Sequence, residues 1–279
     1  MESALYVVAT PIGNLADISA RALAVLAEVD VIAAEDTRHS GQLLAHHNIR
    51  RPLQAYHDHS GPAAARRILE RLDAGQSVAL ISDAGTPLVA DPGYRLVRAV
   101  QDAGHRVVPI PGASALLAAL CASGLPSDRF AFEGFLPARS EARRRRIAEL
   151  AGAAHTLVFF EAPHRLLATL DDLVDVLGPE REAAVARELT KHFETLHRAP
   201  LAALRDWVAG DADQQRGEVV LLLDRAPAVA VELDGALEQL LHGMAEHMPP
   251  KRAAALLAEF SGLRKKQLYE RLLAARAAD

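Results

Sequence analysis

The stretch SVALISDAGTPLVADPG, residues 77–93, decides the fold class of this chain. It begins with the apolar run SVAL and continues into thirteen residues that hold two Gly, two Pro, two Asp, a Ser and a Thr. A short apolar run that ends in turn residues predicts a buried strand followed by an irregular loop. Ligands bind at the carboxyl ends of strands in parallel sheets, so a loop of this kind at a strand exit predicts a ligand site.

Strand-like and helix-like segments alternate on both sides of this stretch, through the first 125 residues. Apolar runs predict the strands, and helical spacing or helix start and stop residues predict the helices between them. The predicted strands are 5–10, 29–36, 77–82 and 106–111, and the predicted helices are 17–28, 37–47, 62–74, 91–104 and 112–124. Strands that are apolar on both faces and alternate with helices predict a parallel sheet covered on both sides.

The pattern changes after SGLPSDRF (123–130), a segment typical of a linker. Further strands are predicted at 156–163, 182–190, 192–199 and 217–224, and we expect them to form a mixed parallel and antiparallel sheet. Helices at 251–260 and 264–275, joined by a short turn with a Gly, predict a helix-turn-helix. The chain is therefore predicted to have an N-terminal α/β domain at 1–122, a second α/β domain at 123–226 and a helical extension at 227–279.

The net charge and the length of the apolar runs exclude some classes of protein. The net charge of −5 over 279 residues excludes a protein whose whole surface binds nucleic acid. Two local basic segments remain: RRRR at 143–146, and 249–276, which holds seven basic residues against two acids. For both segments, an RNA contact and a solvated helix surface stay open. No apolar run approaches the roughly 20 residues of a membrane-spanning helix, and no basic segment precedes the first apolar run, so we expect neither a membrane span nor a secretory signal.

Cysteine and histidine usage argues against a metal or disulfide framework. Cys121 is the only cysteine, which excludes an intramolecular disulfide and a Cys-based zinc site and suits a cytoplasmic protein. Its Ala/Leu-rich surroundings predict a small core residue. Histidines cluster at His46, His47, His57 and His59, but in polar sequence without cysteine they predict no metal site.

Three strand exits carry loops that suit a ligand: ATPIGN (9–14), SDAGTPLVADPG (82–93) and PIPGASA (109–115). A nucleotide phosphate fits these loops poorly, because the chain has no G-x-x-x-x-G-K-[ST], no G-x-G-x-x-G and no Lys before position 191. A zwitterion without phosphates, such as S-adenosylmethionine, fits better, since it needs close backbone, a few hydroxyls and no nearby cation. Gly13, Gly85 and Gly112 allow that close approach. The alternative is that the loops are only tight strand–helix connections.

Seven blocks along the chain together resemble one family. They are LYVVATPIGNLADIS, AAEDTRHSGQLL, SDAGTPLVADPGYRLV, PIPGASA, FFEAPHRL, ARELTKHFE and GEVVLLL, in this order over residues 4–225. This set resembles the bacterial 16S rRNA (cytidine-2′-O)-methyltransferases of the tetrapyrrole methylase-like superfamily. The basic C-terminal segment also resembles the extension of that subfamily.

The resemblance implies two α/β domains that hold S-adenosylmethionine in a cleft, usually in a homodimer, and methyl transfer to a cytidine ribose 2′-OH in the decoding region of the small subunit. The cofactor contacts that it implies are Ile12, Gly13, Gly85, Thr86, Pro87, Val89, Ser114, Ala115, Phe160, Ala186, Arg187, Gly217 and Glu218. Related members have Gly-Asp-Pro where this chain has Gly85-Thr86-Pro87, so a carboxylate contact at that turn is in doubt.

Methyl transfer needs alignment and a base for the hydroxyl rather than a metal. The base candidates are Asp36 and Glu161, with His164, Glu188 and Lys191 behind them. Each has a structural alternative: Asp36 could cap the helix that starts at Thr37, Glu161 could pair with Arg165, and Lys191 would need a lowered pKa. Phosphate contacts are predicted for Arg38, Arg143, Arg144, Arg165, Lys265 and Lys266.

Two other functions stay open at this point. The same fold could methylate a small tetrapyrrole or a protein side chain. A non-catalytic ribosome-binding or assembly factor could also keep the fold without its cofactor.

Overall fold

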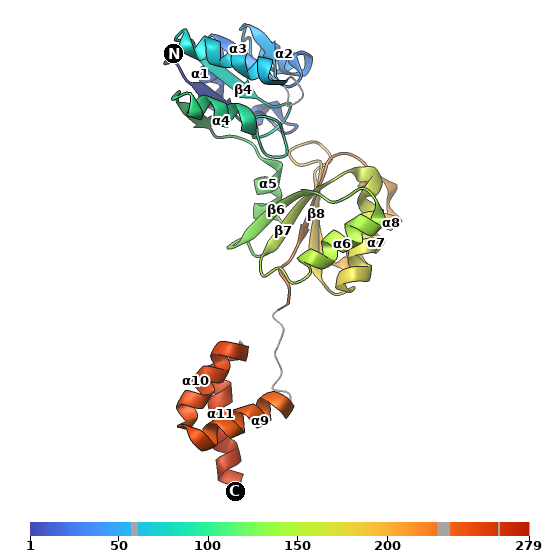
Figure 1. The fold of residues 1–279 in the computed structure, drawn as a ribbon. Helices are drawn as coiled ribbons and strands as arrows, with labels where there is room; N and C mark the ends of the chain where they lie inside the picture. Colours follow the sequence, from blue (N-terminus) through green and yellow to red (C-terminus); the bar gives the residue numbers. More distant parts are fainter. Residues whose placement is uncertain (57–60, 228–234, 262, 279) are drawn as a thin grey trace. The chain divides into compact units, whose positions relative to one another are not determined.

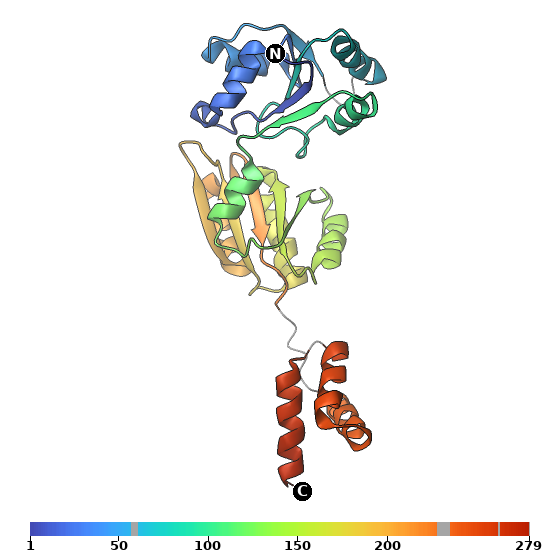
Figure 2. The ribbon, with the colours of Figure 1, turned by 90° about the vertical axis from the view of Figure 1, so that its left-hand side faces the viewer.

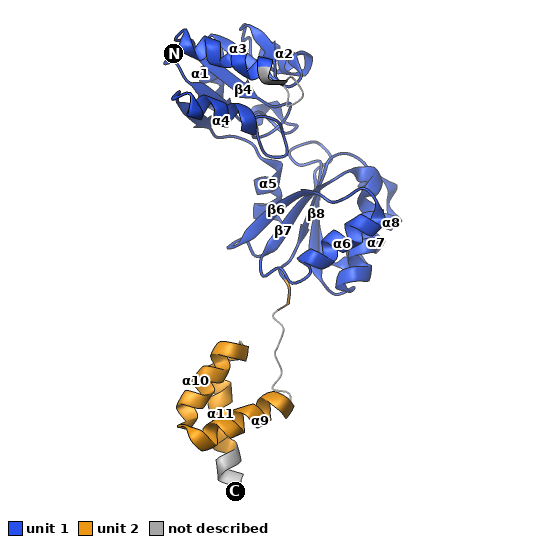
Figure 3. Ribbon diagram, viewed as in Figure 1, with its two compact units in different colours: residues 1–225 blue, residues 226–279 orange. Residues whose placement is uncertain are grey.

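The computed structural model describes residues 1–56, 61–227, 235–261 and 263–278. Their contacts divide the chain into two compact units, Met1–Arg225 and Ala226–Asp279 (Figure 3). Within these ranges no helix combines the length and the apolar character that crossing a membrane requires.

A five-stranded parallel sheet lies at the centre of the N-terminal half of the first unit (Figure 1). Its strand order is β3-β2-β4-β1-β5. The strands are β1 (Leu5–Val8), β2 (Val31–Ala34), β3 (Leu53–Ala55), β4 (Val78–Ile81) and β5 (Val107–Ile110). The prediction of a parallel sheet is confirmed.

Helices cover both faces of this sheet, as its doubly apolar strands predict. They are α1 (Ala20–Glu28), α2 (Thr37–His46), α3 (Gly61–Asp73) and α4 (Tyr94–Asp102). One face packs on α1 and α2 through residues such as Leu26 and Leu44. The other packs on α3 and α4 through Ile68 and Leu96.

The second sheet is mixed, with strand order β6-β7-β10-β8-β9. Only β6 and β7 run parallel, and the other neighbours are antiparallel, so the prediction of a mixed sheet is confirmed. The strands are β6 (Phe130–Phe135), β7 (Thr156–Glu161), β8 (Glu182–Arg187), β9 (Thr195–Pro200) and β10 (Val219–Leu223). One face packs on three helices, α6 (Ser140–Leu150), α7 (Leu166–Leu177) and α8 (Leu201–Gly210).

Helix α5 (Ala115–Ala122) packs against the opposite face of the second sheet, although it follows the last strand of the first (Figure 2). Leu116, Ala119 and Leu120 contact the β7, β8 and β10 side chains of that face. This packing favours grouping α5 with the second sheet rather than with residues 1–122. Because only one side of α5 is buried, Leu117 and Cys121 are exposed on the other, and the prediction of a buried Cys121 is wrong.

Three local predictions differ from the structure. Strands β6 and β3 were not predicted: β6 begins at Phe130, the last residue of the predicted linker, and β3 has only three residues. Helix α4 begins at Tyr94, three residues after Asp91, because the preceding Gly93 has φ +135°, which no helix residue adopts.

The second unit is a three-helix bundle of α9 (Gly235–His247), α10 (Pro250–Ser261) and α11 (Lys265–Ala278). Its core includes Leu241, Ala254, Leu257 and Leu268. The α10–turn–α11 arrangement confirms the two helices that the sequence predicts here.

Candidate active site

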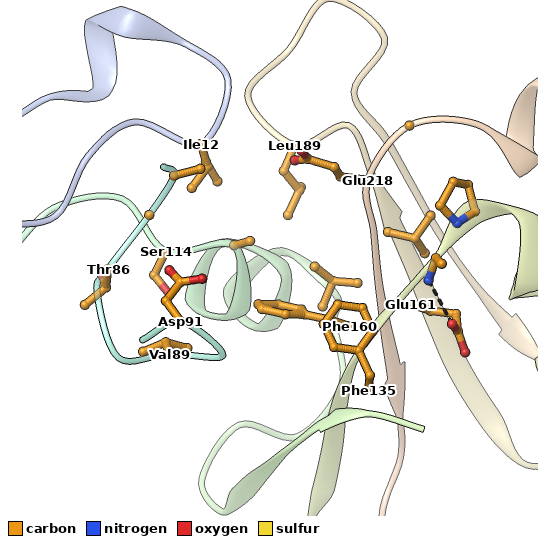
Figure 4. Close-up of a pocket in the computed structure, with 18 residues that line it drawn as sticks. Ile12, Thr86, Val89, Asp91, Ser114, Phe135, Phe160, Glu161, Leu189 and Glu218 are labelled. Atoms are coloured by element: carbon orange, nitrogen blue, oxygen red, sulfur yellow. Dashed lines mark hydrogen bonds between the residues drawn. The ribbon is translucent and has the colours of Figure 1, made fainter. Parts of the chain in front are cut away.

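A cavity of about 420 Å³ lies between the loops that leave β1, β4 and β5 and the strand ends of the second sheet (Figure 4). This volume falls in the usual range of small-molecule sites. The first-sheet loops contribute Ile12, Ala84, Gly85, Thr86, Val89, Asp91, Ser114 and Ala115. The second sheet and its loops contribute Phe135, Phe160, Glu161, Ala162, Pro163, Leu189, Gly217, Glu218, Val219 and Val220.

Backbone hydrogen bonds hold the first-sheet loops together. The Thr10 N–H donates to the Gly85 carbonyl at 2.9 Å, and the Gly85 N–H donates back to the Thr10 carbonyl at 3.1 Å. The Thr86 hydroxyl donates to the Ala113 carbonyl at 3.0 Å. The exits of β1, β4 and β5 therefore form one connected wall of the cavity.

The loop from Gly85 to Gly93 has an unusual backbone. Gly85 and Gly93 have positive φ, and so do two residues that carry side chains, Leu88 (φ 73°) and Ala90 (φ 64°). Non-glycine residues adopt this conformation at a cost, and such strain clusters at functional sites. The loop residues of the opening stretch thus take up a specific, costly shape beside the cavity.

Most of the predicted cofactor contacts line the cavity. They are Ile12, Gly85, Thr86, Val89, Ser114, Ala115, Phe160, Gly217 and Glu218. Gly13, Pro87, Ala186 and Arg187 are not among the lining residues. Ala186 is buried in the core under α5, and the Arg187 guanidinium is buried and donates to Gln214, Phe193 and Thr195. Ala186 and Arg187 therefore belong to the protein interior beside the cavity and not to its lining.

The charges of the lining suit a cationic ligand. Among the described residues that line the cavity there are three carboxylates, Asp91, Glu161 and Glu218, and no Lys, Arg or His. Phe135 and Phe160 add an aromatic wall, with ring centroids 5.9 Å apart. The lining carboxylates would repel a phosphate and attract a sulfonium or ammonium group.

Glu161 is buried and its carboxylate is fully engaged. It is 3% exposed, its Oε1 accepts from the Ala162 N–H at 2.8 Å, and its Oε2 accepts from the Thr169 hydroxyl at 2.7 Å. The Arg165 Nε lies 3.3 Å from Oε1. The pairing with Arg165 that the sequence offered as an alternative is present, and it leaves Glu161 tied to the start of α7.

Asp36 has the capping geometry that the sequence also offered. Its Oδ1 accepts from the Arg38 N–H at 2.7 Å and from the His39 N–H at 3.4 Å, at the first turn of α2. These hydrogen bonds lower the pKa of the Asp36 carboxyl below its usual value. Asp36 is not among the residues that line the cavity.

Asp91 is the cavity carboxylate that the sequence patterns did not reveal. The dipeptide Asp91-Pro92 predicts a helix start, which hid its place in the loop. Burial raises the pKa of the Asp91 carboxyl, a hydrogen bond with Ser82 lowers it, and the charge of Asp83 raises it; the net shift is upward. A search for carboxylate side chains in the loops that follow the strands, made without regard to helix signals, would have found Asp91.

Lys191 is not among the lining residues, but it contacts the lining residue Glu218. Its Nζ lies 2.9 Å from Glu188 Oε1 and 3.1 Å from Glu218 Oε2, and its side chain lies against Gly13. Burial lowers the pKa of the ammonium, but hydrogen bonds to Glu188 and Glu218 outweigh it and raise the pKa above its usual value. The lowered pKa that a basic role for Lys191 requires is therefore absent.

The predicted RNA-contacting residues fall into two groups. Arg38, Lys265 and Lys266 have side chains in solvent, with Arg38 91% and Lys266 86% exposed. Arg144 is partly exposed and pairs with Asp172 at 3.3 Å and Asp175 at 2.6 Å. Arg143 is buried in an ion pair with Asp172 at 2.7 Å, and Arg165 donates to the Leu136 carbonyl at 2.7 Å. Burial and internal pairing argue against RNA contacts by Arg143 and Arg165, and we leave both out of the RNA surface.

No cluster of His, Cys, Asp and Glu within the described ranges could hold a metal ion. His46 and His47 stack edge to face instead, with centroids 4.8 Å apart. His57 and His59 lie outside the described residues.

Two family models match the chain. Tetrapyrrole (Corrin/Porphyrin) Methylases matches residues 4–205, and RsmI C-terminal HTH domain matches residues 231–276. The chain belongs to the tetrapyrrole methylase family. The family models therefore account for both compact units, and the chain is a methyltransferase.

Close relatives of this tetrapyrrole methylase span nearly its whole length. It is 54% identical over 271 residues to Ribosomal RNA small subunit methyltransferase I of Pseudomonas aeruginosa, covering 96% of each chain. It is 50% identical to the protein of that name in Haemophilus influenzae, covering 95% of each.

Solved structures agree on the fold. Diphthine synthase matches with a TM-score of 0.61 at 18% identity, over 79% of this chain and 89% of that one. Uroporphyrin-III C-methyl transferase from Thermus thermophilus, complexed with S-adenosyl homocysteine, matches with a TM-score of 0.53 at 21% identity, over 79% and 97%.

Proposed function

We propose that the protein is an S-adenosylmethionine-dependent methyltransferase that methylates the ribose 2′-OH of a cytidine in the decoding region of 16S rRNA. The observation that carries this proposal is the full-length similarity to relatives named Ribosomal RNA small subunit methyltransferase I. The cytidine, the 2′-oxygen and the decoding region follow from the motif resemblance and are the part to be tested.

The cavity supports the cofactor on chemical grounds. Its lining has carboxylates and no cation among the described residues, and its walls hold the hydroxyls of Thr86 and Ser114 and the rings of Phe135 and Phe160. These groups fit a ligand with a sulfonium, an amino-acid head and an adenosine. When bound, S-adenosylmethionine supplies an electrophilic methyl group whose leaving group is a neutral thioether.

The residues of the chain then act mainly by alignment. The first-sheet loops, joined by the Thr10–Gly85 backbone pair, fix one wall, and the strand ends of β7 and β10 fix the other. Holding two reactants in line can supply about 7–11 kcal/mol of the barrier reduction. Glu161, locked by Thr169 and Ala162, holds the β7 exit in place rather than accepting a proton.

RNA contact is assigned to exposed basic side chains. In the second unit these include Lys265 and Lys266 at the start of α11, and in the first unit Arg38. They are cations in a chain of net charge −5, so they act as local phosphate contacts. Because the protein as a whole is acidic and its basic patches are local, we expect it to recognise the shape of an assembled small subunit better than a short RNA.

A homodimer in the cytoplasm completes the proposal. Leu117 on α5 and Phe130 on the edge strand β6 are 53% and 43% exposed, and a second copy could bury them. Light scattering at micromolar concentration tests this. A monomer would contradict it.

The deciding experiment uses small subunits from cells that lack the modification. The protein is incubated with them and labelled S-adenosylmethionine, and the label is mapped by nuclease digestion and mass spectrometry. We expect one 2′-O-methylcytidine in the decoding region, and slower transfer to a short oligonucleotide of that sequence. Label on a base atom, on protein or on a tetrapyrrole would refute the assignment, and no binding of the cofactor by calorimetry would favour a non-catalytic ribosome-binding factor.

A further inference from the structure

The cavity presents three carboxylates, and they differ in how far each is already engaged. Glu161 has a donor on each oxygen and an Arg165 partner. Glu218 has its side chain 75% exposed and pairs with Lys191 at the rim. Asp91 is half-buried, and its interactions are with the neighbouring Ser82 and the like charge of Asp83.

Asp91 is also held by a loop whose backbone is set at a cost. Leu88 and Ala90 before it have positive φ, and Gly93 after it has φ +135°. Figure 4 shows Asp91 among the first-sheet loop residues, with Phe135 and Phe160 on the second-sheet side. Among the described residues no cationic partner of Asp91 is found, and a half-buried carboxylate of this kind is unfavourable for stability; such arrangements cluster at functional sites.

We propose that Asp91 is the general base that accepts the proton of the substrate hydroxyl. This inference rests on the proposed 2′-O-methylation. In the step, the hydroxyl O–H bond breaks and its proton passes to a carboxylate oxygen of Asp91. The oxygen electron pair forms the new O–CH₃ bond, and the methyl–sulfur bond breaks with its electron pair left on sulfur. The products are a methyl ether, a neutral thioether and a protonated Asp91.

Other side chains near the cavity suit this role less well. No histidine is among the described lining residues, and Lys191 is held as an ammonium by two glutamates. Asp36 caps α2 away from the lining. The raised pKa of Asp91 brings its basicity nearer to neutral pH, where a general base is most effective.

The test compares Asp91→Asn and Asp91→Glu with wild type on small subunits that lack the modification. General-base removal costs about 10²–10⁴-fold, so we expect that loss of kcat in Asp91→Asn and partial recovery in Asp91→Glu. The wild-type rate should fall at low pH along an acid limb that the Asn variant lacks. Asp102→Asn, an exposed change on α4, is the matched control and should behave as wild type.

Two readouts separate catalysis from other roles. Calorimetry with S-adenosyl homocysteine should give a Kd within about tenfold of wild type for Asp91→Asn. Thermal unfolding should show this variant more stable than wild type at neutral pH, with the gain fading in acid. The raised folded-state pKa means that the stability contribution of Asp91 is present at low pH and is lost as pH rises through that pKa.

Several results would overturn the assignment. Wild-type kcat in Asp91→Asn would exclude Asp91 as the base, and a Kd raised by more than about tenfold with kcat kept at saturation would make it a cofactor-binding residue. Failure of the proposed function is visible separately, because wild-type protein would then place its label somewhere other than a ribose oxygen.

Discussion

Single residues set the shape of the cavity, and Gly85 is the clearest case. Its φ of +79° allows the two hydrogen bonds with Thr10 that join the loop after β1 to the loop after β4. A Cβ at this position would lie 3.2 Å from Ile12 Cγ2, another lining atom. Any side chain here therefore strains the backbone and also pushes on the cavity wall.

Gly85→Ala should destabilise the protein by about 1–2 kcal/mol, the cost of a left-handed L-residue, and should weaken cofactor binding. Urea denaturation and calorimetry measure the two effects. Gly152→Ala is the control, because a Cβ there meets nothing within 4 Å, and its effect should stay within about 0.5 kcal/mol. Unchanged stability and affinity in Gly85→Ala would refute this role of the loop.

The Lys191 side chain lies against Gly13 and pairs with Glu188 and Glu218, so its removal should lower stability. Lys191→Met leaves Glu188, whose side chain is 17% exposed, without its cation, at an expected cost of about 1–2 kcal/mol at neutral pH. Burial raises the pKa of Glu188, but hydrogen bonds from Lys191 and the Glu218 N–H outweigh burial, so the net shift is downward.

The sign of the pH dependence follows from that downward shift. The stability that Glu188 contributes is present above its unfolded-state pKa and is lost as pH falls through its folded-state pKa. The difference between wild type and Lys191→Met in thermal unfolding should therefore shrink in acid. Glu218→Gln, at a side chain 75% exposed, should change stability by less than about 0.5 kcal/mol. A pH-independent difference would show that Lys191 acts through packing alone.

The sequence predicts where the site lies better than what each carboxylate does. Loop composition at three strand exits located the lining residues of the first-sheet side, because glycine and proline mark turns whatever surrounds them, whereas the second-sheet side was reached only through the family resemblance. The roles of Glu161 and Asp36 depend on partners such as Thr169, eight residues from Glu161, that loop motifs do not reveal. Asp91 was missed because its local signal, a helix start, is overridden by the φ of Gly93.

At the scale of elements, buried strands are predictable and edge elements are not. Strands β1, β2 and β4 are almost entirely buried, so their sequences are continuously apolar. Strand β6 is an edge strand with exposed ends and a register shift between Phe132 and Gly134, so its sequence lacks the continuous apolar run of a buried strand and it was not predicted. The sequence of α5 is apolar enough to pack on either sheet. It therefore does not predict that the helix packs on the second sheet.

The four consecutive arginines on α6 lie on different sides of the helix, so some are buried and others are exposed. Arg143 is 4% exposed and bonded to Asp172 on α7, whereas the Arg145 side chain is 71% exposed and pairs with Glu141 one turn away. Removing one partner of a buried pair costs about 3–5 kcal/mol, because the other charge stays buried without compensation.

Arg143→Met should lower the free energy of unfolding by up to about 3 kcal/mol in urea denaturation, because Asp172 keeps its hydrogen bonds from Ser140 and its contact with Arg144. Arg145→Met, the matched change two residues on, should alter it by less than about 1 kcal/mol. Equal effects of the two substitutions would contradict the assignment of Arg143 to the α6–α7 interface.

At the scale of the molecule, the cavity and the basic start of α11 lie in different compact units. The cavity lies within residues 1–225, and the described second unit presents Arg264, Lys265 and Lys266 to solvent. Charge in the second unit should therefore act on RNA binding without changing the cofactor site.

Neutralising Lys265 and Lys266 to Gln should weaken binding to small subunits and flatten its salt dependence, by roughly 0.7–0.9 in log–log slope for each RNA phosphate that the variant no longer neutralises. Calorimetric affinity for the cofactor should stay at the wild-type value. Arg95→Gln with Arg98→Gln removes the same charge from exposed positions on α4 and serves as the control. A salt slope that falls equally in both double variants would reflect net charge alone. An unchanged slope in the Lys variant would make the start of α11 a solvated surface, and the proposed RNA contact would then have to come from the first unit.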